Sequence, residues 1–164
     1  MMAVGGGALL GAAFFFWIAG PRVIDPRAFE WLMKSDWRIN FLGWHLFRND
    51  PWQWPPGRIT GYLAGEGTTI GFTDSVPLAA LVLKPLDAWL PTPFQYFGLW
   101  LWLCFALQGA FGALIVRVWT RSLVLQLLGA LLFVLVPTLL MRVGHPALTA
   151  HFVLRWALWL FLAS

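Results

Sequence analysis

Charged side chains are scarce in this sequence. Only 11% of its 164 residues are Asp, Glu, Lys or Arg, whereas a soluble domain carries about 25%. Hydrophobic residues make up 60% of the chain, and the mean hydropathy is +0.73. This composition excludes an ordinary soluble domain, and it also excludes a disordered chain, which combines low hydrophobicity with high net charge. An integral membrane protein, or a fragment of one, remains.

Cysteine and the common ligand-binding motifs are also missing. The single Cys104 excludes a disulfide framework and any zinc site built on several cysteines. The glycines around residues 65–67 match neither GxGxxG nor GxxxxGK[ST], and no HExxH occurs. A nucleotide cradle and a dense metal site are therefore unsupported.

Acidic residues are absent outside residues 25–87. All seven lie within that range, and seven bases at residues 22–84 balance them. The formal charge of +4 comes from Arg117, Arg121, Arg142 and Arg155. Because these four arginines are scattered among apolar segments, they form no continuous basic face, and nucleic-acid binding is not expected despite a pI near 10.0.

Long charge-free stretches predict the fold class. Residues 1–21, 88–116 and 122–141 contain no charged side chain, and about 20 apolar residues suffice to cross a bilayer as a helix. We expect an all-α, multi-pass transmembrane helical bundle that forms one transmembrane module. Its expected parts are a span at 4–20, an outer loop with membrane-surface helices at 21–92, and spans at 94–116, 123–141 and 146–163.

Prolines lie at or near an end of three of these predicted spans. Pro21 follows the first span and makes a poor cleavage site, so we favour an anchor over a signal peptide. Pro137 lies near the end of the third span, where a kink is tolerable if neighbours satisfy the freed backbone groups. Pro146 is expected in the first turn of the fourth span.

Two arginines predict which segments lie on each side of the membrane. Arg117 and Arg121 lie between the second and third spans, so the positive-inside rule places that segment in the cytoplasm. The loop 21–92 is then extracytoplasmic in a bacterial inner membrane. Residues 76–90 are too short and too interrupted by charge to cross, and we expect an interfacial or re-entrant helix there. If they did cross, the loop would lie in the cytoplasm.

Tryptophan is abundant in the loop and indicates contact with the membrane surface. Six of the twelve tryptophans lie there: Trp31, Trp37, Trp44, Trp52, Trp54 and Trp89. Tryptophan favours the headgroup region of a bilayer. Residues 35–48 have helical character, with Trp37, Phe41 and Trp44 as one apolar stripe. We expect this helix to lie flat on the bilayer.

Two acidic residues stand at expected helix starts. Ser35 is the expected N-cap of the first helix, and Asp36 favours its first turn. Either Asp74 or Ser75 is expected to cap the second helix, with Pro77 in its first turn. Both aspartates therefore have a purely structural explanation beside any functional one.

A second polar cluster lies in the C-terminal part of the chain. Arg142 and His145 are expected at the outer mouth between the third and fourth spans, and His151 and Arg155 share one face of the fourth. A charge within a span usually faces a bundle interior or an aqueous cavity. Arg142 has a structural alternative, because an arginine at a span end can reach the interface by itself.

The predicted layout resembles the N-terminal module of the GT-C superfamily of membrane glycosyltransferases, which includes protein mannosyltransferases and lipid A aminoarabinose transferases. More closely, three segments look like an uncharacterised bacterial family catalogued as DUF6311. They read WRINFLGWHLFR at 37–48, FTDSVPL at 72–78 and GHPAL at 144–148. The chain departs from the superfamily in having fewer spans and no Asp-Glu pair, so it resembles only an N-terminal part of a longer protein.

The resemblance implies a membrane glycosyltransferase that uses a polyprenyl-phosphate sugar donor. Asp36 would be its catalytic carboxylate, taking a proton from an acceptor hydroxyl. Arg142 would neutralise the leaving phosphate, with Arg58 as a lesser candidate. His145 would assist with a hydrogen bond, and Asp74 is a further candidate for substrate binding.

The expected partners are the lipid bilayer, the sugar donor and the remaining transmembrane helices of a longer chain, without nucleic acid. No cofactor is implied with certainty, and a divalent metal stays open. Two alternatives also stay open. One is a transporter or channel subunit that lines a polar path with His151 and Arg155. The other is a structural membrane fragment without activity.

Overall fold

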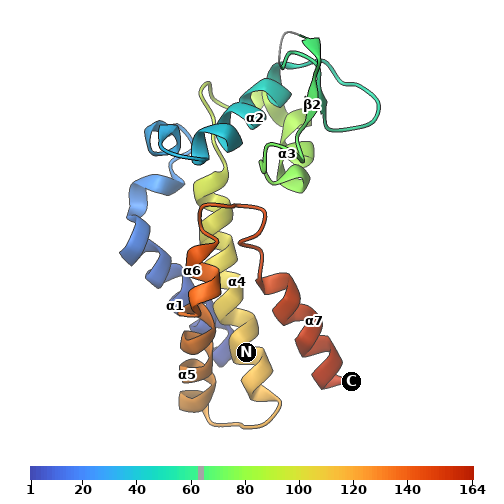
Figure 1. The fold of residues 1–164 in the computed structure, drawn as a ribbon. Coiled ribbons are helices and arrows are strands. Elements are labelled where there is room, and N and C mark those ends of the chain that lie inside the picture. The colour runs from blue at the N-terminus through green and yellow to red at the C-terminus, as the bar shows by residue number, and fades with distance from the viewer. Residues whose placement is uncertain (63–64) are drawn as a thin grey trace. The chain divides into compact units, whose positions relative to one another are not determined.

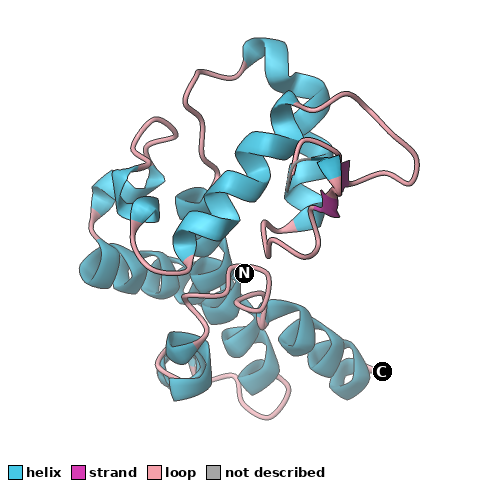
Figure 2. Cartoon of the chain, turned by 45° about the horizontal axis from the view of Figure 1, so that its top comes forward, coloured by secondary structure: helices cyan, strands magenta, loops and turns pink. Residues whose placement is uncertain are grey.

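Helices make up most of the chain, which the computed structural model describes over residues 1–62 and 65–164 (Figures 1 and 2). The chain forms two compact units. The helical unit consists of Met1–Asp25, Tyr96–Val143 and Leu148–Ser164. The inserted unit consists of Pro26–Gln95 and Gly144–Ala147.

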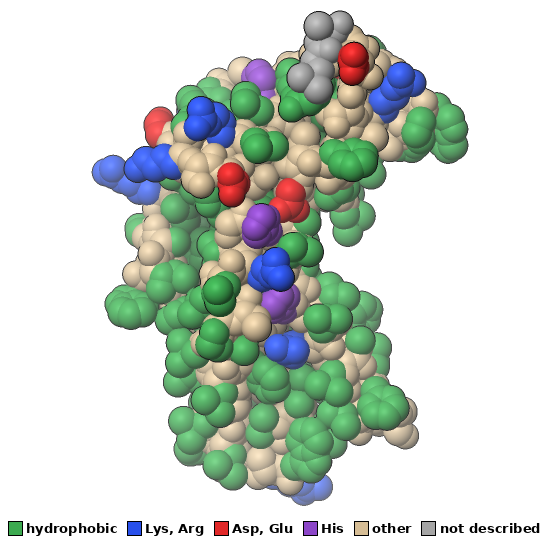
Figure 3. Space-filling model, viewed as in Figure 1, with side chains coloured by type: hydrophobic (Ala, Val, Ile, Leu, Met, Phe, Trp, Pro, Cys, Tyr) green, Lys and Arg blue, Asp and Glu red, His purple; other side chains and the backbone are tan. Residues whose placement is uncertain are grey.

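Apolar helices dominate the helical unit. Its elements are α1 (Met2–Ala19), the 3-10 helix η1 (Pro21–Ile24), α4 (Phe97–Arg117), α5 (Leu123–Val134), α6 (Pro137–Met141) and α7 (Phe152–Ala163). Among the described residues, three segments are long and apolar enough to cross a membrane: Met2–Ala19, Phe97–Arg117 and Leu123–Met141. Hydrophobic side chains cover much of the surface of these helices in Figure 3. The chain is therefore a membrane protein.

Close packing of α1 against α4 depends on small residues. Gly7 and Gly11 are spaced as in a GxxxG motif, and Gly109 of α4 lies against Gly7. A Cβ at Gly11 would overlap the carbonyl group of Phe105, and a Cβ at Gly109 would overlap that of Gly7. In an apolar environment helices associate through such close backbone approach. These glycines therefore set the distance between α1 and α4, beside which α5 also packs (Figure 1).

The helix α5 ends before Pro137, and a side chain of the neighbouring helix α4 replaces the hydrogen-bond donor that the proline lacks. Pro137 has no N–H, so the carbonyl of Phe133 loses its usual donor four residues later. The buried side chain of Gln108 on α4 donates its Nε2–H to that carbonyl at 3.0 Å. The helix is interrupted here, between α5 and α6, and a neighbouring side chain satisfies the freed backbone group as a kink at Pro137 would require.

The fourth predicted span is wrong in its start. The helix α7 begins at Phe152 rather than near Pro146 and is described to Ala163. Gly144–Ala147 belong to the inserted unit, and the Thr149 hydroxyl donates to the carbonyl of Arg142 at 2.8 Å. These interactions compete with helix formation before Phe152.

The inserted unit has a hydrophobic core of its own. Its elements are η2 (Glu30–Met33), α2 (Trp37–Asn49), β1 (Arg58–Ile59), β2 (Thr68–Thr69), α3 (Pro77–Leu83) and η4 (Lys84–Trp89). The two short strands are antiparallel, with Arg58 opposite Thr69. Buried apolar side chains come from several of these elements: Leu32, Phe41, Trp44, Phe47, Ile59, Ile70, Val76 and Ala80.

The predicted helices of the loop exist, but their apolar stripe and their caps differ from the expectation. Trp44 and Phe41 are buried within the inserted unit, so this stripe of α2 packs against protein rather than facing a bilayer. Asp36, not Ser35, is the N-cap of α2, and it makes no side-chain capping bond. Val76 is the N-cap of α3, so neither Asp74 nor Ser75 caps it. At the start of α3 the Ser75 hydroxyl bonds to the carbonyl of Asn40 instead of capping the helix.

Replacing Gly11 by alanine should destabilise the helical unit. The added Cβ would meet the backbone of α4 at Phe105, which cannot move aside as a flexible side chain can. We expect a loss of about 1–3 kcal/mol, the usual cost of overpacking. Gly5→Ala on the same helix is the matched control, since nothing lies within 4 Å of its added Cβ. Unfolding in detergent micelles measures both, and equal stability of the two variants would contradict the assigned contact.

Candidate functional site

Two of the five predicted site residues come together in the inserted unit. A carboxylate oxygen of Asp74 lies 3.5 Å from Nδ1 of His145, although 71 positions separate them in the sequence. Asp36 and Arg58 are exposed elsewhere in the inserted unit, at the start of α2 and on β1. Arg142 is exposed in the helical unit. The pair of Asp74 and His145 is the candidate site.

The pair is partly open to solvent. The side chain of His145 is 50% exposed and that of Asp74 is 30% exposed. The backbone N–H of Ala147 and the imidazole of His145 both donate to the Asp74 carboxylate. The carboxylate thus approaches one imidazole nitrogen and bonds to the 144–147 segment, while the His145 side chain stays half exposed.

A hydrogen-bonded turn holds Asp74 in place. The Ser75 hydroxyl donates to the carbonyl of Asn40 on α2 at 2.6 Å. The Thr73 hydroxyl donates to the carbonyl of Ile70 at 3.0 Å and lies 2.7 Å from the Ser75 hydroxyl. Thr73 and Ser75 are both buried. The side chains of Thr73 and Ser75 therefore point into the unit and hold the backbone of Asp74 between them in place.

The same turn has a strained backbone. Asp74 and Val76 have φ values of 51° and 49°, in the left-handed region that L-residues rarely adopt. For a β-branched residue such as Val76 this conformation costs about 1–3 kcal/mol and persists only where the surroundings enforce it. Strain of this kind concentrates at functional sites. Here it directs the chain into α3 directly after the candidate carboxylate.

A glycine on α2 makes room for the turn. A Cβ at Gly43 would lie 2.7 Å from the Ser75 hydroxyl oxygen and closer still to Thr73. Only a residue without a side chain lets the two hydroxyls approach the helix so closely. Gly43 is therefore a positioning residue for Asp74, although it does not touch the carboxylate.

Burial changes the protonation of the candidate carboxylate. Partial desolvation raises the pKa of Asp74 above the ordinary 3.8, because a charged carboxylate is disfavoured away from water. The Ala147 N–H and His145 oppose this effect and lower the pKa, but burial outweighs them. Among the five predicted residues, Asp74 has both a partner and a perturbed pKa, which is typical of an acid–base group.

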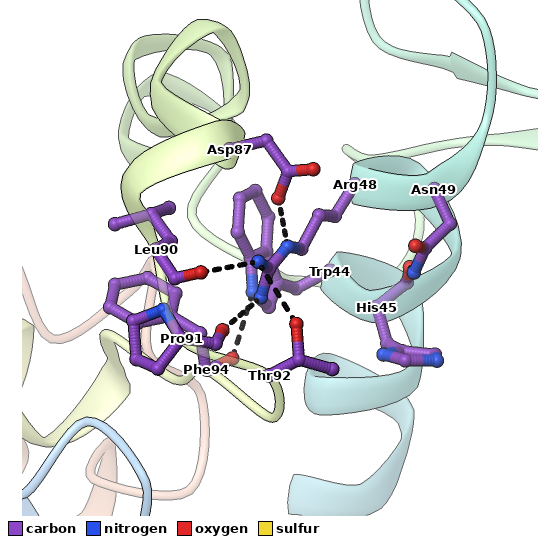
Figure 4. A network of polar contacts seen from close by, with 9 residues as sticks. All are labelled: Trp44, His45, Arg48, Asn49, Asp87, Leu90, Pro91, Thr92 and Phe94. Carbon is purple, nitrogen blue, oxygen red and sulfur yellow. Dashed lines mark hydrogen bonds and ion pairs between the residues drawn. The ribbon is translucent and has the colours of Figure 1, made fainter.

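The far end of α2 is fixed by an arginine (Figure 4). The Arg48 guanidinium forms an ion pair with Asp87 and donates to the carbonyls of Leu90 and Pro91 at 3.1 and 2.8 Å. The Trp44 indole donates to the carbonyl of Phe94 at 3.0 Å. This network ties α2 to the segment that follows η4. It explains Arg48 as a structural cation, not as part of the candidate site.

Two further observations describe the rest of the structure around the candidate pair. Within residues 1–62 and 65–164, no group of three or more His, Cys, Asp or Glu side chains could hold a metal ion. A hollow of about 640 Å³ lies in the helical unit and is lined by Arg117, Arg121 and Gln126, among others, but by none of the five predicted residues. A paired carboxylate and imidazole can accept, hold and return a proton, so general acid–base chemistry is what the site offers.

Sequence reasoning missed the residues that support the site. Asn40, Gly43, Thr73 and Ser75 act through contacts between α2 and a turn more than 25 residues away. Helical periodicity and capping patterns describe neighbours within a helix and contain no signal for such contacts. The segments at 72–78 and 144–148 stood out separately in the sequence, but nothing there indicated that they meet.

Comparison with known proteins places most of the chain in one family. A family model described as "Domain of unknown function (DUF6311)" matches residues 8–164. No match was found among curated proteins or among solved structures. The matched range contains both members of the Asp74 and His145 pair and all the residues that support it.

Replacing Gly43 by alanine should disturb the site without touching it. The added methyl group would push Thr73 and Ser75 away from α2 and move Asp74 with them, at a cost of about 1–3 kcal/mol. Gly71→Ala is the control, since its added Cβ makes only an ordinary 3.5 Å contact. The NMR shift of the His145 imidazole reports the pairing. An unchanged His145 signal in Gly43→Ala would refute the positioning role.

Replacing Asp74 by asparagine should change how stability depends on pH. Since the pKa of Asp74 is raised above 3.8, the folded chain binds this proton more tightly than the unfolded chain. Its contribution to the free energy of unfolding is complete below pH 3.8 and is lost as the pH rises through the folded pKa. Denaturation across this window should show a steeper fall for the wild type than for Asp74→Asn. Parallel curves would contradict the assigned burial.

Proposed function

The chain belongs to the DUF6311 family, and we propose that it is a membrane glycosyltransferase, or its N-terminal part. The proposed reaction transfers a sugar from a polyprenyl-phosphate donor to an acceptor hydroxyl on the extracytoplasmic face of a bacterial inner membrane. The proposed architecture is the multi-pass bundle with membrane-surface helices described from the sequence. The pairing of Asp74 with His145 is the observation that carries the proposal.

The pair supports hydroxyl attack at an anomeric carbon. In such a step the acceptor oxygen bonds to the anomeric carbon, the bond to the lipid phosphate breaks, and the phosphate leaves with the bonding electrons. The hydroxyl proton must go to a base within hydrogen-bond reach. Asp74 and His145 together present a carboxylate and a half-exposed imidazole for this purpose.

The resemblance to GT-C enzymes assigned the base to Asp36, and that assignment stays a prediction. Asp36 is exposed at the start of α2 and makes no side-chain capping bond. Asp74 is better supported as the base, because it is partly buried, paired and held on a rigid turn. The predicted phosphate-binding roles of Arg142 and Arg58 have no further support from contacts.

A membrane-attached unit suits a lipid-linked donor. The inserted unit is connected on both sides to apolar helices of membrane-spanning length, α1 before it and α4 after it. A lipid phosphate stays at the headgroup level of the same bilayer. The transporter alternative rests on Arg155, whose guanidinium lies over the ring of Phe133 at 5.0 Å and whose buried Nε has no hydrogen-bond partner among the described residues. A polar path would need charged side chains on several helices, and Arg155 is the one charge of α7.

Substitutions in the full-length protein test the proposed function. We expect Asp74→Asn and His145→Gln to lower the rate of sugar transfer from a polyprenyl-phosphate donor by about 100-fold or more, the usual contribution of a general base. Glu66→Gln is the matched control, because Glu66 is an exposed acid of the same unit. The measurement is transfer of radiolabelled sugar in reconstituted vesicles.

The outcomes distinguish a wrong assignment of the base from a wrong proposed function. Loss of transfer in Asp36→Asn together with full activity in the Asp74 and His145 variants would move the base to Asp36. Absence of any transfer by the wild-type protein over a panel of lipid-linked sugars and hydroxyl acceptors would reject the glycosyltransferase proposal itself.

A further inference from the structure

The outward face of α3 and η4 is apolar over its whole length. Leu78, Val82, Leu86 and Trp89 are exposed by 72, 60, 40 and 79%. At about 100° per residue in α3 and 120° in η4, they occupy an arc of roughly 120° on one side. We call these four residues the outer stripe. The other exposed residues between Pro77 and Trp89 are Pro85 and Ala88, and the side chain of Asp87 is 43% exposed while it pairs with Arg48.

The opposite face of the same segment is buried in the inserted unit. Val76, Ala80 and Lys84 recur every four residues and are almost completely buried. The ammonium group of Lys84 lies 4.0 Å from the ring centre of Phe47 and 4.8 Å from that of Trp52. Burial lowers the pKa of Lys84, while Asp50 and Asp87 raise it. The one lysine of the segment is thus turned toward the protein.

This arrangement reverses the usual distribution of polarity. A helix on a water-soluble surface turns its charges outward and its apolar stripe inward. Here Lys84 faces the protein, Asp87 pairs with the buried Arg48, and large apolar side chains face outward. The exposed residues of α2 in the same unit are mixed, since Arg38, His45 and Asn49 are polar and Ile39 and Leu42 are apolar. The outer stripe therefore suits contact with an apolar medium.

The connections of the inserted unit identify this medium. Pro26 follows the last residue of α1 after six residues, and Gln95 is separated from the first residue of α4 by Tyr96 alone. Six residues span at most about 25 Å. Both ends of the unit are thus joined through short segments to helices of membrane-spanning length. A bilayer crossed by these helices is therefore an apolar medium close to the unit along the chain.

We infer that α3 and η4 lie in the membrane interface, with the outer stripe inserted among the acyl chains of the lipids. Trp89 stands at the end of the stripe, and tryptophan prefers the level of the headgroups. The inference does not depend on any catalytic activity. It does have a consequence for the candidate site, because Asp74 precedes α3 by three residues and would be held near the lipid phosphates.

Site-directed spin labelling tests this inference in the full chain. Cys104 is buried and is replaced by alanine, and single cysteines are then placed at Leu78, Val82 or Trp89. The protein is reconstituted in vesicles of phosphatidylethanolamine and phosphatidylglycerol. Collision rates of the attached nitroxide with oxygen, which concentrates in the acyl region, are compared with those for a water-soluble nickel chelate.

Reference positions define the two other environments. Glu66→Cys lies in an exposed polar segment of the same unit and should collide mainly with nickel. Ala80→Cys lies on the buried face of α3 and should collide with neither reagent. The labels at the outer stripe should collide severalfold more with oxygen than with nickel. This pattern supports insertion into the bilayer.

Two other patterns would overturn the inference. Preference for nickel at the outer stripe would show that the face contacts water. Low collision with both reagents, as at Ala80, would show that protein covers it, whether from a second copy or from further residues of a longer chain. Neither result depends on sugar transfer, so a failure here is distinguishable from a failure of the proposed function.

Discussion

The contact between α2 and the 73–76 turn is the constraint on which the inserted unit depends. Gly43 lets the hydroxyls of Thr73 and Ser75 reach the helix, and Ser75 then bonds to the carbonyl of Asn40. The backbone of the same turn is left-handed at Asp74 and Val76, directly before α3. The candidate carboxylate and the start of the segment that contains the outer stripe therefore both adjoin one close packing contact.

Apolar side chains serve two opposite purposes in this unit. Trp44 is completely buried and ties α2 to the backbone at Phe94, whereas Trp89 is largely exposed at the end of the outer stripe. Lys84 lies beneath aromatic rings on the inner face instead of extending into water. A unit with an apolar core, an apolar outer stripe and an acid–base pair resembles neither a soluble domain nor a transmembrane bundle. These features suit a segment that works at the lipid surface.

In the helical unit, backbone polar groups must find hydrogen-bond partners within the protein, because an apolar medium supplies no water. Gly7, Gly11 and Gly109 let α1 and α4 approach closely, and Gln108 replaces the donor that Pro137 lacks. Membership in the DUF6311 family extends over both units but assigns no chemistry. The chemical argument therefore rests on Asp74 and His145, whose pairing joins two segments that resembled the family separately.

Local patterns determined the parts of this protein that depend on near neighbours. Charge-free lengths predicted α1, α4 and the proline-interrupted segment of α5 and α6, because span length and hydropathy are properties of a continuous stretch. The helix at 35–48 and a short helix after Val76 were also within reach of periodicity. Only the tertiary structure decided that α7 begins at Phe152, that Trp44 is buried, and that Asp74 pairs with His145 instead of capping α3. Each of these depends on contacts between distant residues, whose energies outweigh the local preferences that a sequence displays.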